Sequence, residues 1–150
     1  MKRQTGTILE DAVEGLGRHL GLTVLRQFKL GRRITGRERL IDIIFRNNDK
    51  NLAIECKFQG GSGSAEDKII ASLEDLKCIP TDRAILAHAG PGFRDVLISH
   101  LAHYGTLIAW SDLQRWVELH FNLTPRKVIY TDSRLDAEIK YWADKTKKKR

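Results

Sequence analysis

The sequence predicts an α/β protein in which a mixed central sheet is flanked by helices. Three observations lead to this prediction: an amphipathic helix pattern opens the chain, three strand patterns joined by turn residues follow it, and helix and strand patterns then alternate. Strands joined by tight turns pair antiparallel, whereas strands joined through helices usually pair parallel. A chain of 150 residues with 41% hydrophobic residues fits one globular domain over residues 1–150.

The first half is predicted to be a helix followed by a three-strand antiparallel meander. Between Thr7 and Leu20, apolar residues recur at spacings of three and four, and Gly21 ends the pattern. Turn residues from Asn47 to Lys50 join the second and third strand patterns. The predicted strands are Leu22–Leu30, Arg39–Phe45 and Leu52–Phe58.

The second half is predicted to alternate helices and strands. Ser64 and Asp67 have the spacing of a capping box, so a helix is expected to begin there and to stop before Pro80. Residues after Pro125 give no clear pattern, and a basic, mobile tail is expected at about 144–150. The remaining predicted elements are a strand at Arg83–Ala89, a helix at Pro91–Tyr104, a strand at Thr106–Trp110 and a helix at Ser111–Phe121 capped by Ser111 or Asp112.

The composition favours a nucleic-acid partner and gives no sign of a membrane segment. The formal net charge is +7 and the pI is about 9.6, which suits a polyanionic partner because each neutralised phosphate releases counterions. No apolar run approaches the roughly 20 residues of a membrane helix, and the N-terminal residues do not resemble a signal peptide. We therefore expect a soluble, cytoplasmic protein.

The cysteines and the glycine-rich stretch argue against a disulfide framework, a zinc site and a nucleotide-binding loop. Cys56 and Cys78 are too few for a disulfide framework and lack the spacing of a zinc site. The glycine-rich stretch 60–64 lacks the Gly-Lys-Ser/Thr ending of a nucleotide-binding P-loop. We interpret it as a loop that orders over DNA, or simply as a flexible connector, and expect no organic cofactor.

The clearest chemical signal comes from Asp42 together with Glu55, Lys57 and Gln59. Side chains on a strand alternate between faces, so Glu55, Lys57 and Gln59 project from one face of the third strand. Asp42 lies in an otherwise apolar strand, where an unpaired buried charge is costly and a metal ion would compensate it. If the two strands pair, Asp42 and Glu55 supply the oxygen ligands that Mg²⁺ prefers. Lys57 would then orient or deprotonate a water, or neutralise charge in the transition state.

Asp42 followed after twelve residues by Glu55-Cys56-Lys57 resembles the signature of the PD-(D/E)XK nuclease superfamily. The predicted element order over roughly residues 5–110 resembles that superfamily's restriction-endonuclease-like core. The resemblance implies a Mg²⁺-dependent DNA endonuclease, with Mn²⁺ as a substitute. Its implied metal ligands are Asp42, Glu55 and the backbone carbonyl of Cys56, with Lys57 assisting the attacking water.

The resemblance also brings in residues outside the signature itself. Gly6-Thr7-Ile8-Leu9-Glu10 resembles the Gly-x-x-x-Glu of archaeal Holliday-junction resolvases, which makes Glu10 a further catalytic and metal-ligand candidate. Gln59 is given an auxiliary role in positioning water or phosphate. Ile41 stands where the superfamily name has proline, a position not expected to touch the metal. A resolvase cuts two strands symmetrically, so a homodimer is expected.

Cations near the first two strands are predicted to contact DNA. They lie in and around the loop that joins these strands, with Glu38 as the only nearby acid, and could follow a phosphate backbone. A further lysine at the start of the next helix, together with Glu66, is expected near the site. The predicted DNA-binding residues are Arg26, Lys29, Arg32, Arg33, Arg37, Arg39 and Lys68.

Each of these assignments has a purely structural alternative. Glu55 and Lys57 could form an ion pair on an exposed strand, and the basic loop could be an ordinary solvated hairpin. Glu10 could belong to a solvated helix stripe with Glu14 and Arg18. The alternative for the whole chain is a non-catalytic DNA-binding or assembly module that keeps the nuclease fold, although the intact set of carboxylates and lysine favours the enzyme.

Overall fold

The computed structural model of the chain describes residues 5–33, 35–61 and 65–147. The elements are α1 (Thr5–His19), β1 (Thr23–Arg32), β2 (Glu38–Asn47), β3 (Lys50–Phe58), α2 (Ala65–Leu76), β4 (Ala84–Ala89), α3 (Asp95–Leu101), η1 (Ala102–Tyr104), β5 (Leu107–Ala109), α4 (Trp110–His120) and α5 (Ser133–Lys147). Among the described helices, none combines the length and the apolar character that crossing a membrane requires.

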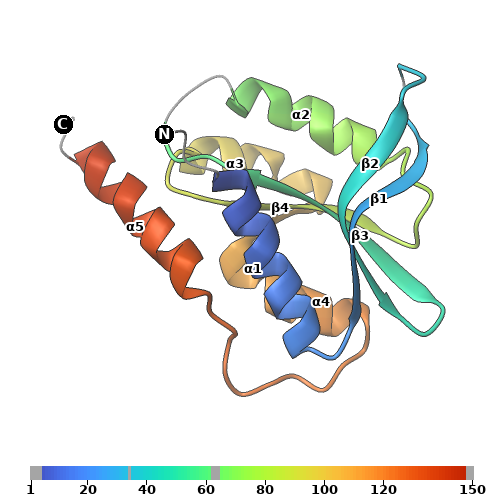
Figure 1. Cartoon of the computed structure of the whole chain (residues 1–150). Helices are drawn as coiled ribbons and strands as arrows, with labels where there is room; N and C mark the ends of the chain where they lie inside the picture. The colour runs from blue at the N-terminus through green and yellow to red at the C-terminus, as the bar shows by residue number, and fades with distance from the viewer. Residues whose placement is uncertain (1–4, 34, 62–64, 148–150) are drawn as a thin grey trace.

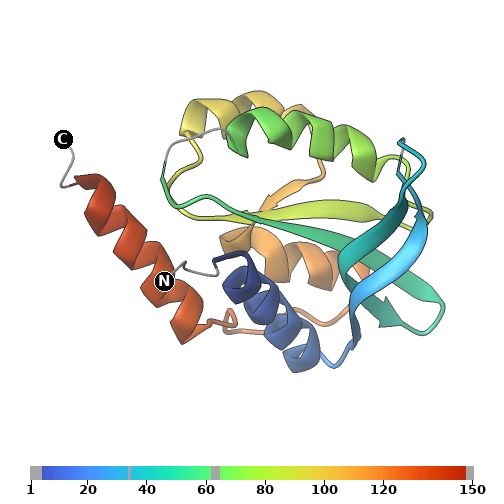
Figure 2. The same ribbon diagram turned by 45° about the horizontal axis from the view of Figure 1, so that its top comes forward.

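The strands form one five-stranded mixed sheet in the order β1-β2-β3-β4-β5, with helices on both of its faces (Figures 1 and 2). β1, β2 and β3 pair antiparallel, whereas β3, β4 and β5 pair parallel. The parallel strands are joined through α2 and through α3 with η1. The predicted α/β fold, with its antiparallel meander followed by parallel crossovers, is therefore confirmed.

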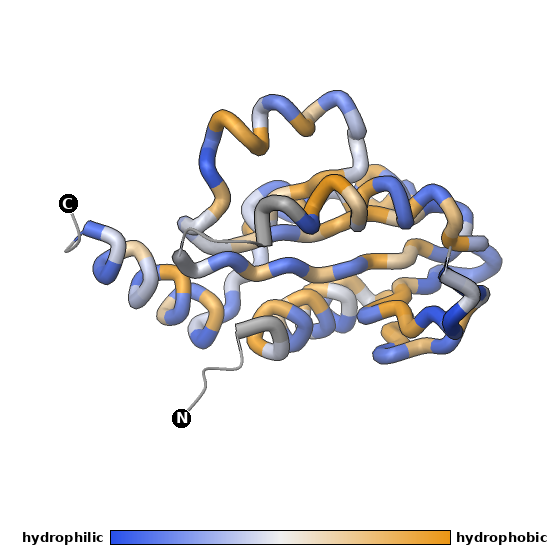
Figure 3. Tube along the Cα trace, turned by 90° about the horizontal axis from the view of Figure 1, so that it is seen from above, coloured by the Kyte–Doolittle hydropathy of each residue, from blue (hydrophilic) through white to orange (hydrophobic). Residues whose placement is uncertain are grey.

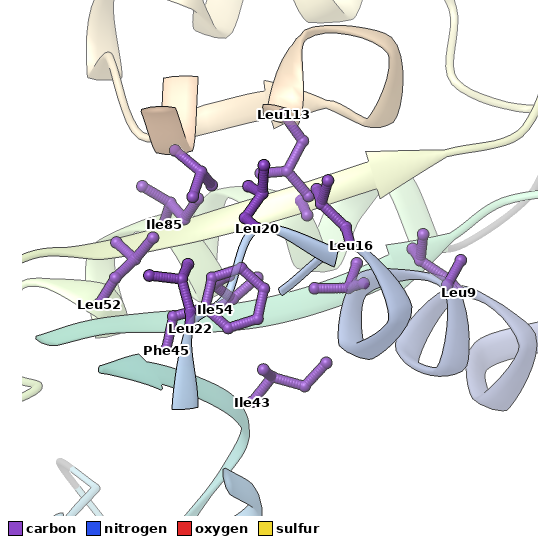
Figure 4. Close-up of a cluster of buried hydrophobic side chains, with 14 of the residues drawn as sticks. Leu9, Leu16, Leu20, Leu22, Ile43, Phe45, Leu52, Ile54, Ile85 and Leu113 are labelled. Atoms are coloured by element: carbon purple, nitrogen blue, oxygen red, sulfur yellow. The ribbon is translucent and has the colours of Figure 1, made fainter. Parts of the chain in front are cut away.

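Two apolar cores hold the helices against the two faces of the sheet. The core on the α1 side also includes residues of α4 and α5, and Figure 4 shows its centre, with Leu9, Leu16, Phe45, Ile54 and Leu113. The core on the other side joins α2 and α3 to the sheet through Ile44, Ile69, Leu73, Leu86 and Leu101. Figure 3 shows hydrophobic and hydrophilic residues alternating along both helices and strands, as expected of elements with one buried side. A charged side chain within this sheet therefore needs a specific partner or role.

β1 and β2 leave the rest of the sheet together at Asp42, a point that we call the fork. β2 pairs with β3 only as far as Ile43, opposite Ile54. Its pairing with β1 continues to Glu38, and we call β1, β2 and the loop that joins them the ribbon. Figure 1 shows the two strands extending together beyond β3. Ile43 belongs to the α1-side core but Ile41 to the α2-side core, so the alternation of faces along β2 breaks at Asp42.

The third helix of the chain begins later than predicted. The Gly92 amide donates a hydrogen bond to the Gln59 carbonyl at 2.8 Å. This bond holds the segment before the helix against the turn that follows β3, so α3 begins only at Asp95. The last residues of the predicted helix form the 3-10 helix η1.

Helix caps were predicted for α4 and α2. α4 begins at Trp110, directly after β5, and its N-cap is Ala109, which makes no side-chain capping bond. The prediction that Ser111 or Asp112 caps this helix is therefore wrong, because the chain passes from strand to helix without a polar turn. Ser64, from the predicted capping box of α2, lies outside the described residues.

α5 is not among the helices predicted from the sequence. It begins after Asp132, whose Oδ1 atom accepts a hydrogen bond from the Leu135 amide at 2.9 Å, and it buries Leu135 fully in the α1-side core. Residues 144–147, which were predicted to belong to a mobile tail, are the last turn of this helix. Residues 148–150 lie outside the described part of the chain.

Arg39 is buried between β2 and α2, so its predicted contact with DNA is wrong. Its side chain is 0% exposed, and its Nη2 atom donates to Asp75 Oδ1 at 2.6 Å. Its Nε and Nη1 atoms are buried without a hydrogen-bond partner. A guanidinium keeps its charge in proteins, so the Asp75 carboxylate is what compensates Arg39 in the core.

Replacing Asp75 by Ala should destabilise the fold by about 2–3 kcal/mol, because the buried Arg39 guanidinium loses its counter-charge. Glu74→Ala is the matched control, since the exposed Glu74 carboxylate pairs with Lys77 and accepts a hydrogen bond from Tyr104 at the surface, so its loss should cost much less. Urea unfolding measures both changes. Equal destabilisation by the two substitutions would contradict the role assigned to Asp75.

Candidate active site

At the fork, the Asp42 carboxylate accepts a hydrogen bond from the backbone of β3 in place of the missing strand pairing. Where the ladder between β2 and β3 stops, the backbone amide of Cys56 donates to Asp42 Oδ2 at 2.9 Å. The N–H and C=O of one residue in an extended strand point to the same edge, so the Cys56 carbonyl also faces the fork. The backbone of β3 therefore brings together two of the predicted metal ligands.

Glu55 and Lys57 lie on the α2 side of β3. Their neighbours Ile54 and Cys56 pack in the α1-side core, as the alternation of a strand requires. The two charged side chains line a groove of about 400 Å³ that is also bordered by the β1–β2 ribbon and by α2. The other residues that line the groove are Arg33, Thr35, Lys68, Ala71, Ser72 and Asp75.

Glu10 approaches Asp42 from α1, on the opposite side of the sheet. Only 15% of its side chain is exposed. Burial, followed by the charge of Asp42, raises the pKa of Glu10 to about 7. The same two causes, in the same order, raise the pKa of Glu55 to about 9. Asp42 is therefore the common neighbour of two acids that reach it from opposite faces.

This set of oxygen donors suits a hard divalent cation. Among the described residues, no group of three or more His, Cys, Asp or Glu side chains surrounds a single metal position. Mg²⁺ commonly needs only one or two carboxylates and completes its shell with water and phosphate oxygens. Asp42 with Glu55 and the Cys56 carbonyl form such a partial set, and Asp42 with Glu10 forms another. A cation there would offset the burial and the charge of Asp42, which together raise the pKa values of both glutamates.

Gln59 is not among the residues that line the groove. Its side-chain amide donates to the Gly61 carbonyl, and its backbone carbonyl accepts the Gly92 amide. Gly60 packs so closely on Trp142 of α5 that a Cβ atom there would lie 2.3 Å from the ring. Gln59 thus belongs to a tightly packed turn after β3, and its role at the reacting phosphate stays a prediction.

The predicted DNA-binding cations of the ribbon and of α2 are at the surface. Arg33, from the loop between β1 and β2, and Lys68, from α2, both line the groove. Lys29, Arg32 and Arg37 are exposed along the ribbon. All five positions are accessible to a phosphate backbone, and their contact with DNA stays a prediction.

Arg26 and Gln27 instead bind the acids of α1. The Nη1 atom of Arg26 lies 2.6 Å from Asp11 Oδ1 and 3.2 Å from Glu14 Oε1, so Arg26 anchors α1 to β1, and its contact with DNA stays a prediction. Gln27 Nε2 donates to Glu10 Oε1 at 3.0 Å. Gln27 was not predicted from the sequence, because a single glutamine in a strand forms no pattern. The sequence did offer one indication: three acids lie close together on α1, Glu10, Asp11 and Glu14, and they need hydrogen-bond donors from a neighbouring element.

A family model described as a PD-(D/E)XK nuclease superfamily domain matches residues 2–115, and residues 116–150, which include α5, lie outside that match. No curated protein matches the chain.

Two solved structures resemble the chain. A protein of unknown function, AF1548, has 16% sequence identity and a TM-score of 0.49, with 90% of this chain and 78% of that chain covered. Protein VC1899 from Vibrio cholerae has 20% identity and a TM-score of 0.48, with 79% of this chain covered. The alignment spans only 33% of VC1899. With TM-scores below 0.5, these likenesses carry no functional information.

Replacing Asp42 by Asn should stabilise the metal-free protein at alkaline pH. A carboxyl group with a raised pKa in the folded state loses stability as the pH rises from its unfolded value through its folded value. For Glu10 and Glu55 this window runs from the ordinary value of 4.5 to about 7 and about 9. The asparagine side chain can still accept the Cys56 amide hydrogen bond, but it carries no repulsive charge.

Urea unfolding in EDTA at pH 5 and pH 9 measures this effect. We expect Asp42→Asn to gain about 1 kcal/mol relative to the wild type at pH 9, the value of somewhat less than one pKa unit. The gain should shrink at pH 5, where both glutamates are mostly protonated in the folded protein. A loss of stability at pH 9, or the same change at both pH values, would contradict the charge repulsion.

Proposed function

The chain belongs to the PD-(D/E)XK nuclease superfamily, and from that premise we propose that it is a metal-dependent DNA endonuclease that hydrolyses phosphodiester bonds. Membership of the superfamily indicates a nuclease-type hydrolase. The finer assignment is supported above all by one observation: Asp42 and Glu55 meet at the fork, and Glu55 and Lys57 line a groove together with Arg33 and Lys68.

Asp42, Glu55 and the Cys56 carbonyl would hold a Mg²⁺ ion, for which Mn²⁺ can substitute, and Glu10 would assist from α1. The bound ion would polarise the phosphate and lower the pKa of a bound water. The carboxylates fit this task because they repel one another without a cation. Their mutual repulsion lowers the stability of the metal-free fold, and such a loss is expected of a site whose functional state is the metal-bound one.

Lys57 is proposed to act on the attacking water and on the charge that develops at phosphorus. Burial and Asp42 raise the pKa of Glu55, and the charge of Lys57 partly opposes this rise, as expected of an ammonium group near that carboxylate. An ammonium group in this position can orient the water or stabilise the negative transition state. The side chain is exposed to the groove and is therefore accessible to a substrate.

The groove gives the substrate strand a proposed path. Arg33 stands on the ribbon and Lys68 on α2, so a phosphate backbone between them would meet a positive charge from each wall. Thr35 and Ser72 add hydroxyl groups along the same path. The exposed cations of the ribbon continue the positive surface away from the site. Symmetric cutting of two strands would need a homodimer, which we keep as part of the proposal.

A non-catalytic DNA-binding or assembly module is the alternative. Such a module would use the groove cations but would have no need of three neighbouring acids. Because Asp42 raises the pKa values of both Glu10 and Glu55, this acid cluster weakens the metal-free fold at neutral and alkaline pH. The cluster thus favours the enzyme.

Asp42→Asn and Lys57→Ala should each reduce DNA cleavage by about 10²–10⁴-fold, the range typical for removing a group that acts on the transition state. Cleavage of supercoiled plasmid, single-stranded DNA and a four-way junction, with Mg²⁺, Mn²⁺ or EDTA, measures this loss and identifies the preferred substrate. Lys127→Ala, which removes an exposed cation between α4 and α5, should cleave like the wild type. Binding without cleavage on every substrate would favour the non-catalytic module.

Arg33→Ala and Lys68→Ala should each weaken DNA binding whatever the DNA sequence. Each should also make the slope of log K against log salt concentration shallower by about one, because one fewer counterion is released. Fluorescence anisotropy at several salt concentrations in EDTA measures this without cleavage. Lys127→Ala is again the control and should leave the slope unchanged. If all three variants lose affinity equally, the groove is not the path of the DNA strand.

A further inference from the structure

We propose that Gln27 is a positioning residue that holds Glu10 in place for the metal ion. The inference rests on the proposed metal-dependent function and goes beyond it, because Gln27 is not part of the signature of acids and lysine. Three independent observations support it: a direct hydrogen bond, an unusual backbone conformation, and the position of Gln27 opposite Asp42.

The hydrogen bond joins Gln27 to the carboxylate of Glu10. Gln27 Nε2 lies 3.0 Å from Glu10 Oε1, and the Arg26 Nη2 atom lies 3.7 Å from the other oxygen, Oε2. A carboxylate accepts hydrogen bonds, so the donating NH₂ of the amide is the group that faces it. Glu10 is thus oriented by neighbouring residues of β1, one through each of its oxygens. Groups that orient a metal ligand in this way strongly affect metal affinity.

The backbone of Gln27 is unusual for its residue type. Three described residues other than glycine have a positive φ: Gln27 at 48°, Asn48 at 56° and Asn122 at 55°. Asparagine is the common choice among non-glycine residues in this left-handed region, whereas glutamine is not. Neither glycine nor asparagine stands at position 27, although both would fit its backbone better. Strain of this kind tends to be kept where the side chain has a function.

The strained backbone explains how β1 reaches α1 with two consecutive residues. Neighbouring side chains on a regular strand point to opposite faces. Arg26 nevertheless binds Asp11 and Glu14, and Gln27 binds Glu10, all on the same helix. The left-handed conformation at Gln27 breaks the alternation and turns its amide to the side of α1.

Gln27, where the alternation of β1 breaks, lies directly opposite the fork on β2. Arg26 pairs with Ile43 and Phe28 pairs with Ile41, so Gln27 stands across from Asp42. The alternation of β2 also breaks at Asp42, where its carboxylate turns to the Cys56 amide. The two irregular positions of the ribbon thus face each other, and each directs one acidic side chain toward the proposed metal position. A kink that served only to bend the ribbon would not need an amide aimed at Glu10.

The test measures Mn²⁺ binding by the full-length chain, from the electron paramagnetic resonance signal of free Mn²⁺, and thermal unfolding in EDTA. The variant is Gln27→Gly, which removes the amide and adopts a positive φ without strain. The matched control is Asn48→Gly, which makes the same backbone change at a similar φ in the β2–β3 turn. Both glycine variants are also made in a Glu10→Ala background, which forms a double-mutant cycle.

We expect Gln27→Gly to raise the Kd for Mn²⁺ about tenfold, as for other residues that orient a metal ligand. Its unfolding temperature in EDTA should not fall, Asn48→Gly should keep the wild-type Kd, and Gln27→Gly should have no further effect once Glu10 is alanine. The proposal is overturned by a wild-type Kd in Gln27→Gly, by an equal loss in the Glu10→Ala background, or by a lower unfolding temperature. A wild-type chain that binds no Mn²⁺ would instead refute the proposed function, and this inference with it.

Discussion

The hydrogen bond from the Cys56 amide to Asp42 is the interaction on which the site depends. It forms where β2 leaves β3, so a side-chain oxygen takes the place of a backbone carbonyl in the sheet. One carboxylate is thereby fixed against the strand that carries Glu55 and Lys57. Because the amide belongs to the residue between them, the register of β3 sets the positions of all three functional groups at once.

This geometry places acidic groups together at a cost to the metal-free fold. Glu10 comes from α1 and Glu55 from β3, and each has its pKa raised by burial and by Asp42. Arg26 partly offsets the charge on the α1 side, and Arg33 and Lys57 do so on the groove side. These cations do not cancel the shifts, which remain upward. The cluster is consistent with a site that is stabilised only when a divalent ion is bound.

The sequence allowed the order of elements up to α4 and the shared face of Glu55 and Lys57 to be predicted, because both depend on local periodicity. The approach of Asp42 to Glu55 was predicted from the pairing of their strands, whereas the break in the alternation at Asp42 was not. Hydrophobic alternation identified the strands, and turn residues identified their antiparallel pairing. The features that escaped prediction depend on contacts between distant segments. Arg39 is a buried partner of Asp75 rather than a surface cation, and a sequence pattern cannot reveal such a pairing. The charged residues of α5 obscured its apolar stripe, and backbone propensity gives no reason to expect a left-handed Gln27.

The most direct test of the account is a crystal structure grown with Mn²⁺, in which anomalous scattering locates the ion. The account predicts a peak at the fork, within about 2–2.5 Å of an Asp42 oxygen and of a second oxygen from Glu55, Glu10 or the Cys56 backbone. An ion bound elsewhere on the chain, or a fork without any ion at saturating Mn²⁺, would contradict the claim that this break in the sheet is a metal-dependent active site.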